Sequence, residues 1–180
     1  MLRALRVSIP FLLLAAGPAL TAAPAATPNV AAALAGTWKF DAARSTELSP
    51  WKTCDLTIAV AGSQITIDRK LAWGRRDFSD RLALDLAKPE TTVAIDYWPD
   101  NRHLGAYVGD DKTKRLRATL LDDGRILRVS ADLTLETQQG PRAVNILSDY
   151  KVSANGAQLT VTELRSTRNR PVVYVFTRAK

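Results

Sequence analysis

Hydrophobic and polar residues alternate with a period of two over most of the chain after residue 53. In the first of these segments Cys54, Leu56 and Ile58 fall on one face, and mostly polar residues fall on the other. Such alternation is typical of a β-strand with one buried face. Similar segments follow at near-regular spacing, and turn signals such as Asp122-Asp123-Gly124 and Asn155-Gly156 separate them. No segment after residue 53 has a sustained 3.6-residue apolar period, so we predict an all-β fold.

One predicted strand carries a charge within its apolar face. Ile65, Ile67, Leu71 and Trp73 occupy the alternating apolar positions, and Arg69 takes the position between Ile67 and Leu71. Arg69 thus breaks the apolar face, and with Lys70 it forms one of the chain's basic clusters, for which a solvated cationic surface is the expectation.

The number and order of the strands predict how the apolar faces are buried. About ten sequential strands with one apolar face each need either a second sheet or closure of the sheet on itself. Closure also removes exposed strand edges. We therefore predict an antiparallel up-and-down β-barrel of about 8–10 strands with an apolar interior, and a β-sandwich is the alternative.

The first 25 residues have the pattern of a secretory signal peptide. Arg3 and Arg6 precede an apolar run over 7–16, and small residues follow it. This run is shorter than the ~20 residues that span a bilayer, so cleavage is favoured over anchoring. We expect a signal peptide over 1–25, a flexible or helical lead-in over 26–34, one barrel domain over 35–180, and a periplasmic or secreted location.

The sequence offers few groups for catalysis. The one histidine, His103, lies in a long predicted loop, and the one cysteine, Cys54, lies on an apolar strand face, so no intramolecular disulfide can form. The aspartate pairs Asp110-Asp111 and Asp122-Asp123 fall at predicted turns. We therefore expect no metal site and no cofactor, and binding is favoured over catalysis. The net charge of +7 is moderate, and an exported protein is a poor candidate for nucleic-acid binding.

The start of the predicted domain resembles a known family. Gly36-Thr37-Trp38-Lys39-Phe40-Asp41, with Ser45 four residues later, resembles the opening strand of bacterial exported lipocalin-like proteins of the calycin superfamily. The resemblance implies that Trp38 closes one end of the barrel under an arginine of the last strand, a role that Arg178 matches by position. Gly36, Trp38 and Arg178 would then be structural residues.

Aromatic residues mark the candidate ligand site. The candidates lie at or near predicted strand ends and in the long loop, where they could line the mouth of a barrel; core packing is the alternative for each of them. They are Trp51, Trp73, Tyr97, Trp98 and Tyr107. This arrangement, together with an apolar interior, predicts a protein that holds an apolar or amphipathic small molecule or lipid.

Two other functions remain open at this level. The start of the domain also bears a faint likeness to exported metalloprotease inhibitors, which are small β-barrels, so a protein partner is one alternative. A barrel in the outer membrane is the other, although most apolar runs here span about seven residues and such strands need ~9–11.

Overall fold

The structure is a computed structural model, and it describes residues 30–46, 48, 51–95, 98, 107–122 and 124–180. The predicted signal peptide, Tyr97 and His103 lie outside these residues.

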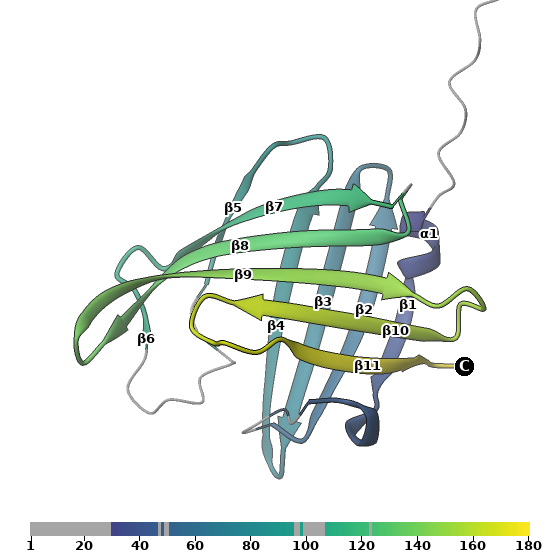
Figure 1. Ribbon diagram of the computed structural model, residues 1–180, viewed down its shortest axis with the longest axis horizontal. Coiled ribbons are helices and arrows are strands. Elements are labelled where there is room, and N and C mark those ends of the chain that lie inside the picture. The colour runs from purple at the N-terminus through teal and green to yellow at the C-terminus, as the bar shows by residue number, and fades with distance from the viewer. Residues whose placement is uncertain (1–29, 47, 49–50, 96–97, 99–106, 123) are drawn as a thin grey trace, which may run out of the picture.

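Ten strands form one antiparallel sheet in the described part of the chain, in the order β4-β3-β2-β1-β11-β10-β9-β8-β7-β5, and the short strand β6 pairs with β8 outside this path (Figure 1). From β1 to β4 and from β7 to β11, strands that follow one another in the sequence are neighbours in the sheet, as in an up-and-down arrangement. The elements are α1 Val30–Leu34, β1 Gly36–Phe40, the 3₁₀ helix η1 Ala42–Arg44, β2 Thr53–Ala61, β3 Gln64–Trp73, β4 Arg76–Asp85, β5 Thr91–Ala94, β6 Tyr107–Val108, β7 Thr113–Leu121, β8 Ile126–Thr137, β9 Gly140–Val152, β10 Gln158–Arg165 and β11 Val172–Arg178.

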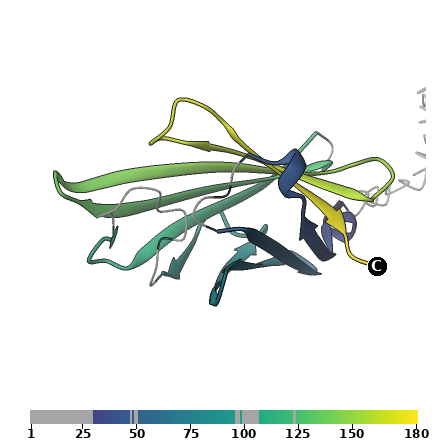
Figure 2. The same ribbon diagram turned by 90° about the horizontal axis from the view of Figure 1, so that it is seen from below.

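The sheet closes into a barrel because its first and last strands pair. Trp38 of β1 lies opposite Arg178 of β11 in an antiparallel ladder. The closure is nearly complete: within the described residues no ladder joins β4 to β5, so the barrel has one seam, between β4 on one side and β5 and β7 on the other. In Figure 2 the strands β2–β4 lie on one side of the barrel and β7–β9 on the other. The predicted barrel is confirmed, and the sandwich alternative is wrong.

Apolar side chains fill most of the barrel interior. In β3, Ile65, Ile67 and Leu71 are buried, in the alternation that the sequence predicted. The outer face is polar and carries cross-strand ion pairs such as Arg81–Asp68. Alternate positions therefore separate core from solvent along each strand. The largest fully buried side chains are Trp38, Phe176, Leu34, Ile65, Ile67, Leu71, Leu84, Leu116, Leu127, Leu159, Val144 and Val172.

One end of the barrel is closed by Trp38 and Arg178. The Arg178 guanidinium carbon lies 4.1 Å from the centroid of the buried Trp38 ring. Arg178 also donates hydrogen bonds to the carbonyls of Ala35 at 2.7 Å and Gly156 at 2.8 Å. Gly36 has φ +133°, and a Cβ added there would lie 2.6 Å from Arg178 Nη1. The site therefore requires glycine both for its backbone conformation and for the close approach of the guanidinium.

Part of the predicted lead-in belongs to the folded domain. Residues Val30–Leu34 form α1, and Leu34 is 1% exposed. The Leu34 carbonyl accepts a hydrogen bond from Trp38 Nε1 at 2.8 Å. The helix that precedes the domain boundary expected at residue 35 therefore packs against the closed end of the barrel.

A candidate binding pocket inside the barrel

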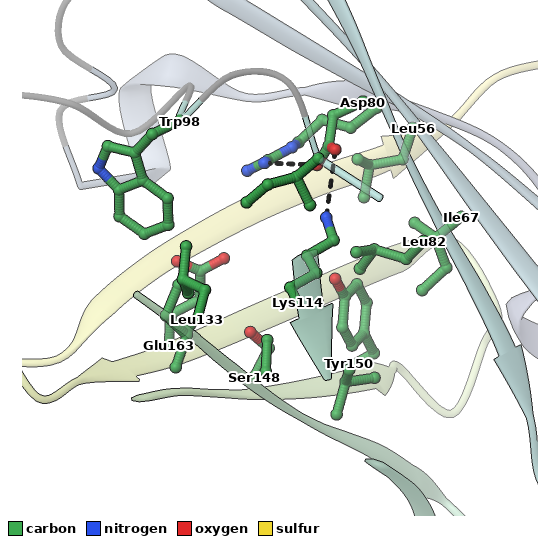
Figure 3. A pocket seen from close by; sticks show the side chains of 15 residues that line it. Leu56, Ile67, Asp80, Leu82, Trp98, Lys114, Leu133, Ser148, Tyr150 and Glu163 are labelled. Carbon is green, nitrogen blue, oxygen red and sulfur yellow. Dashed lines mark hydrogen bonds and ion pairs between the residues drawn. The ribbon is translucent and has the colours of Figure 1, made fainter. Parts of the chain in front are cut away.

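A cavity of about 70 Å³ lies inside the barrel, lined by inward-facing side chains from opposite walls of the barrel (Figure 3). One water occupies roughly 10–15 Å³ on this measure, so the space holds about five waters or a small organic group. Most of the lining is apolar, and polar groups lie at two places on it. The lining residues are Leu56, Ile67, Arg69, Asp80, Leu82, Ile95, Trp98, Lys114, Val129, Ala131, Leu133, Ile146, Ser148, Tyr150 and Glu163.

The first polar group joins the two sides of the seam. Asp80 of β4 accepts hydrogen bonds from Arg69 Nη2 of β3 at 2.8 Å and from Lys114 Nζ of β7 at 3.3 Å. Their side chains are 15%, 18% and 10% exposed. Burial on its own would raise the pKa of Asp80, but the two cations outweigh it and hold that pKa below its usual range. Asp80 is therefore a carboxylate at neutral pH, and its ion pair with Lys114 links β4 to β7 where no ladder does.

The second polar group begins with a buried ion pair within β10. Arg165 donates two hydrogen bonds to Glu163 Oε2, from Nε at 3.0 Å and from Nη2 at 2.5 Å. Both residues are on the inward face of β10, two positions apart, and both are buried. The other carboxylate oxygen, Glu163 Oε1, has no hydrogen-bond partner among the described residues. It therefore remains an available acceptor at the pocket.

Two hydroxyl groups complete this polar group. Ser148 lies directly opposite Glu163 in the β9–β10 ladder, and Tyr150 follows two positions along β9. In Figure 3 the labelled side chains of Ser148, Tyr150 and Glu163 project into the same space. Burial and the charge of Glu163 raise the pKa of Tyr150, so its hydroxyl stays protonated. No hydrogen bond joins either hydroxyl to another described residue.

The aromatic residues that were predicted to line the barrel mouth lie in different places in the structure. Trp98 lines the pocket. Trp51 is buried in the core, where its ring stacks on Phe78 with centroids 6.2 Å apart. Trp73 lies away from the pocket and is 45% exposed. Tyr107 is in β6, and its side chain is outside what the structure describes, as is Tyr97.

The charged and hydroxyl lining was missed at the level of sequence, although one signal was present. Arg69 interrupts the apolar face of its strand, and it is indeed on the pocket. The same test applied to β4, β7 and β10 would have marked Asp80, Lys114 and Glu163, because each occupies an inward position of the alternation. Polar residues at the strand positions that are otherwise apolar were therefore the sequence feature that indicated the polar lining of the pocket.

Nothing in the described residues forms a metal site: no group of three or more histidine, cysteine, aspartate or glutamate side chains there could hold an ion. A search of the same residues for a helix long and apolar enough to cross a membrane finds none.

Comparison with known proteins identifies the fold. No protein-family model and no curated protein matches the sequence. Among solved structures, a fatty acid binding protein of Schistosoma mansoni in complex with arachidonic acid is similar, with a TM-score of 0.51 and 9% sequence identity over 84% of this chain and 100% of that chain. At this identity the similarity shows the fold alone. The protein therefore shares with that structure the fold of a nearly closed up-and-down β-barrel.

Proposed function

We propose that this protein is an exported barrel that holds an apolar or amphipathic small molecule in the pocket between β2–β4 and β7–β10. The observation that carries the proposal is an internal cavity with an apolar lining and a few convergent polar side chains, which is the usual composition of a small-molecule site. The similar structure adds support at the level of class, since that protein is described in complex with arachidonic acid.

The size of the cavity limits what it accepts. About 70 Å³ is less than half of the ~150 Å³ of an engineered cavity that binds benzene. We infer that the pocket takes a compact molecule, or one end of a longer molecule whose remainder passes Trp98.

Export is the second part of the proposal. Two arginines, an apolar run and small residues within 1–25 support it. N-terminal sequencing of protein recovered from outside the producing cell's cytoplasm tests it, with a mature start between 22 and 26 as the expected result. An intact Met1 in that material would contradict it.

A cavity-filling substitution tests the binding site. Ala131 lines the pocket, and Ala131→Leu adds three carbons to that space. The uncharged, slender molecule 1-octanol serves as the probe, and calorimetric titration measures its binding. We expect saturable binding to the unaltered protein and a loss of about tenfold or more in affinity for Ala131→Leu, because the added carbons occupy the probe's volume.

The matched control is Ala143→Leu on the exposed outer face of β9. It adds the same carbons outside the barrel, so it should bind the probe as the unaltered protein does. Circular dichroism checks that both variants keep their strands. Equal binding by the unaltered protein and the folded Ala131→Leu variant would contradict the proposed site.

A further inference from the structure

We propose that the inner surface formed by Ser148, Tyr150 and Glu163, here called the β9–β10 subsite, recognises an uncharged hydrogen-bonding head group such as a hydroxyl or a primary amide. The inference rests on the proposed function and deepens it, since it names the chemical class of ligand that the pocket selects.

The three side chains of the β9–β10 subsite are buried together. Ser148 and Glu163 are 7% exposed and Tyr150 is 6% exposed. The ladder between β9 and β10 places Ser148 opposite Glu163 and Tyr150 opposite Val161, so the three residues share the inward face. Among the described residues, every side-chain nitrogen or oxygen that is itself inaccessible to solvent has a hydrogen-bond partner. The partnerless atoms of the subsite are therefore accessible to a molecule of the size of water, and the three residues that carry them line the pocket.

Such atoms need a partner from outside the protein. A buried polar group without a hydrogen bond is strongly unfavourable, so native proteins almost always satisfy it with protein, water or ligand. Glu163 Oε1 can only accept, whereas the hydroxyls of Ser148 and Tyr150 can donate or accept. A ligand hydroxyl or amide does both: it donates to Glu163 and accepts from a neighbouring hydroxyl.

The charges around the subsite disfavour an ionised head group. A ligand carboxylate beside Glu163 would bring two anions together, and one of them would have to take up a proton. The cations that could compensate are already engaged, Arg165 with Glu163, and Arg69 and Lys114 with Asp80.

A cationic head group is also disfavoured, because positively charged side chains lie close to the subsite. Three cations, Arg69, Lys114 and Arg165, and two carboxylates, Asp80 and Glu163, face or adjoin the pocket. A cationic head group at Glu163 would also lie near Arg165, which already pairs with that carboxylate, so repulsion offsets part of the attraction. A neutral group that both donates and accepts avoids the two penalties.

Three probes with similar chains test the inference by calorimetric titration of the full chain at pH 7.5. They are 1-octanol, methyl octyl ether, which accepts but cannot donate, and octanoate. We expect octanol to bind about tenfold or more tighter than the ether, which loses the hydrogen bond to Glu163. Octanoate should be weaker than octanol by a similar factor.

Substitutions in the β9–β10 subsite test whether its side chains cause the preference for octanol. Ser148→Ala and Tyr150→Phe each remove one hydroxyl and should weaken octanol binding about three- to tenfold. Tyr174→Phe is the matched control, since Tyr174 is a buried tyrosine of β11 that does not line this pocket. Glu163→Gln removes the negative charge and should raise octanoate affinity relative to octanol; if that variant fails to fold, the two hydroxyl variants still decide the question.

The outcomes separate the two proposals. If none of the three probes binds, the proposed function is contradicted. If octanoate binds more tightly than octanol, or the ether binds equally well, the pocket holds ligands but the inference is overturned. Octanol binding that is insensitive to both Ser148→Ala and Tyr150→Phe overturns it as well.

Discussion

The ion pair across the seam gives the most specific prediction about stability. Asp80→Asn removes the carboxylate that accepts hydrogen bonds from Arg69 and Lys114, and it leaves two cations facing a largely apolar interior. Breaking a buried pair by removing one partner destabilises proteins by about 3–5 kcal/mol. Because these side chains are still 10–18% exposed to solvent, we expect a loss in the free energy of unfolding at the lower end of this range, about 3 kcal/mol.

Urea denaturation measures this change. With a slope of about 2 kcal/mol per molar urea, a loss of about 3 kcal/mol lowers the midpoint by about 1.5 M. Asp68→Asn is the matched control, because Asp68 pairs with Arg81 on the outer face, where their side chains are 41% and 69% exposed. Its midpoint should remain nearly unchanged, as is usual for exposed pairs. Adding Lys114→Met to Asp80→Asn should recover part of the loss by removing a buried cation that has lost its ion pair with Asp80.

The pH dependence supplies an independent check. The pKa of Asp80 is lower in the folded protein than in the unfolded chain. The ionised Asp80 therefore contributes to the free energy of unfolding above the ordinary carboxyl pKa of about 3.9, and this contribution is lost as the pH falls through the pKa of Asp80 in the folded protein. The difference in stability between the unaltered protein and Asp80→Asn should therefore be full at pH 7 and shrink below about pH 4. A loss at pH 7 no larger than that of Asp68→Asn would refute this account of the seam.

Two further predictions concern the closed end of the barrel and the pocket hydroxyl. Arg178→Ala removes the contact with the Trp38 ring and the hydrogen bonds to backbone carbonyls; we expect a loss of about 2–3 kcal/mol by urea denaturation, and a midpoint like that of the unaltered protein would contradict the closing role. Tyr150 should remain un-ionised at pH 11 in an absorbance titration of the folded protein, because burial and Glu163 raise its pKa. Tyr150→Phe should therefore leave the titration curve up to pH 11 unchanged, and a smaller amplitude would show that Tyr150 ionises normally. Since the unfolded chain ionises Tyr150 first, its contribution to stability is present below about pH 10 and declines above it.

The alternation of residues was sufficient to predict the strands and their closure. Each strand must bury one face, and strands joined in sequence close most simply on themselves. The same alternation marked Arg69 as an interruption of an apolar face, but the expectation of a solvated basic cluster is wrong for Arg69, which lines the pocket. It did not identify Asp80 and Lys114 as partners, because they are 34 residues apart and meet only across the seam.

The aromatic candidates show a second limit of sequence reasoning. Trp73 and Trp98 both lie near strand ends, yet only Trp98 lines the pocket. Trp73 is the last residue of β3, paired with Arg76 across a tight turn, and the Arg76 guanidinium lies 5.8 Å from its ring centroid. Beyond the last packed layer of a sheet, alternation no longer determines whether a side chain meets the core or solvent.

The central claim is that a ligand lies inside the barrel, and intermolecular nuclear Overhauser effects test it most directly. The experiment titrates methyl-labelled protein with 1-octanol and records which protein methyl groups lie close to the ligand. The account predicts contacts to Val129 and Ile146 on one side of the pocket and Leu82 on the other. Contacts confined to outer-face methyl groups such as that of Ala143, with none to these three residues, would contradict it.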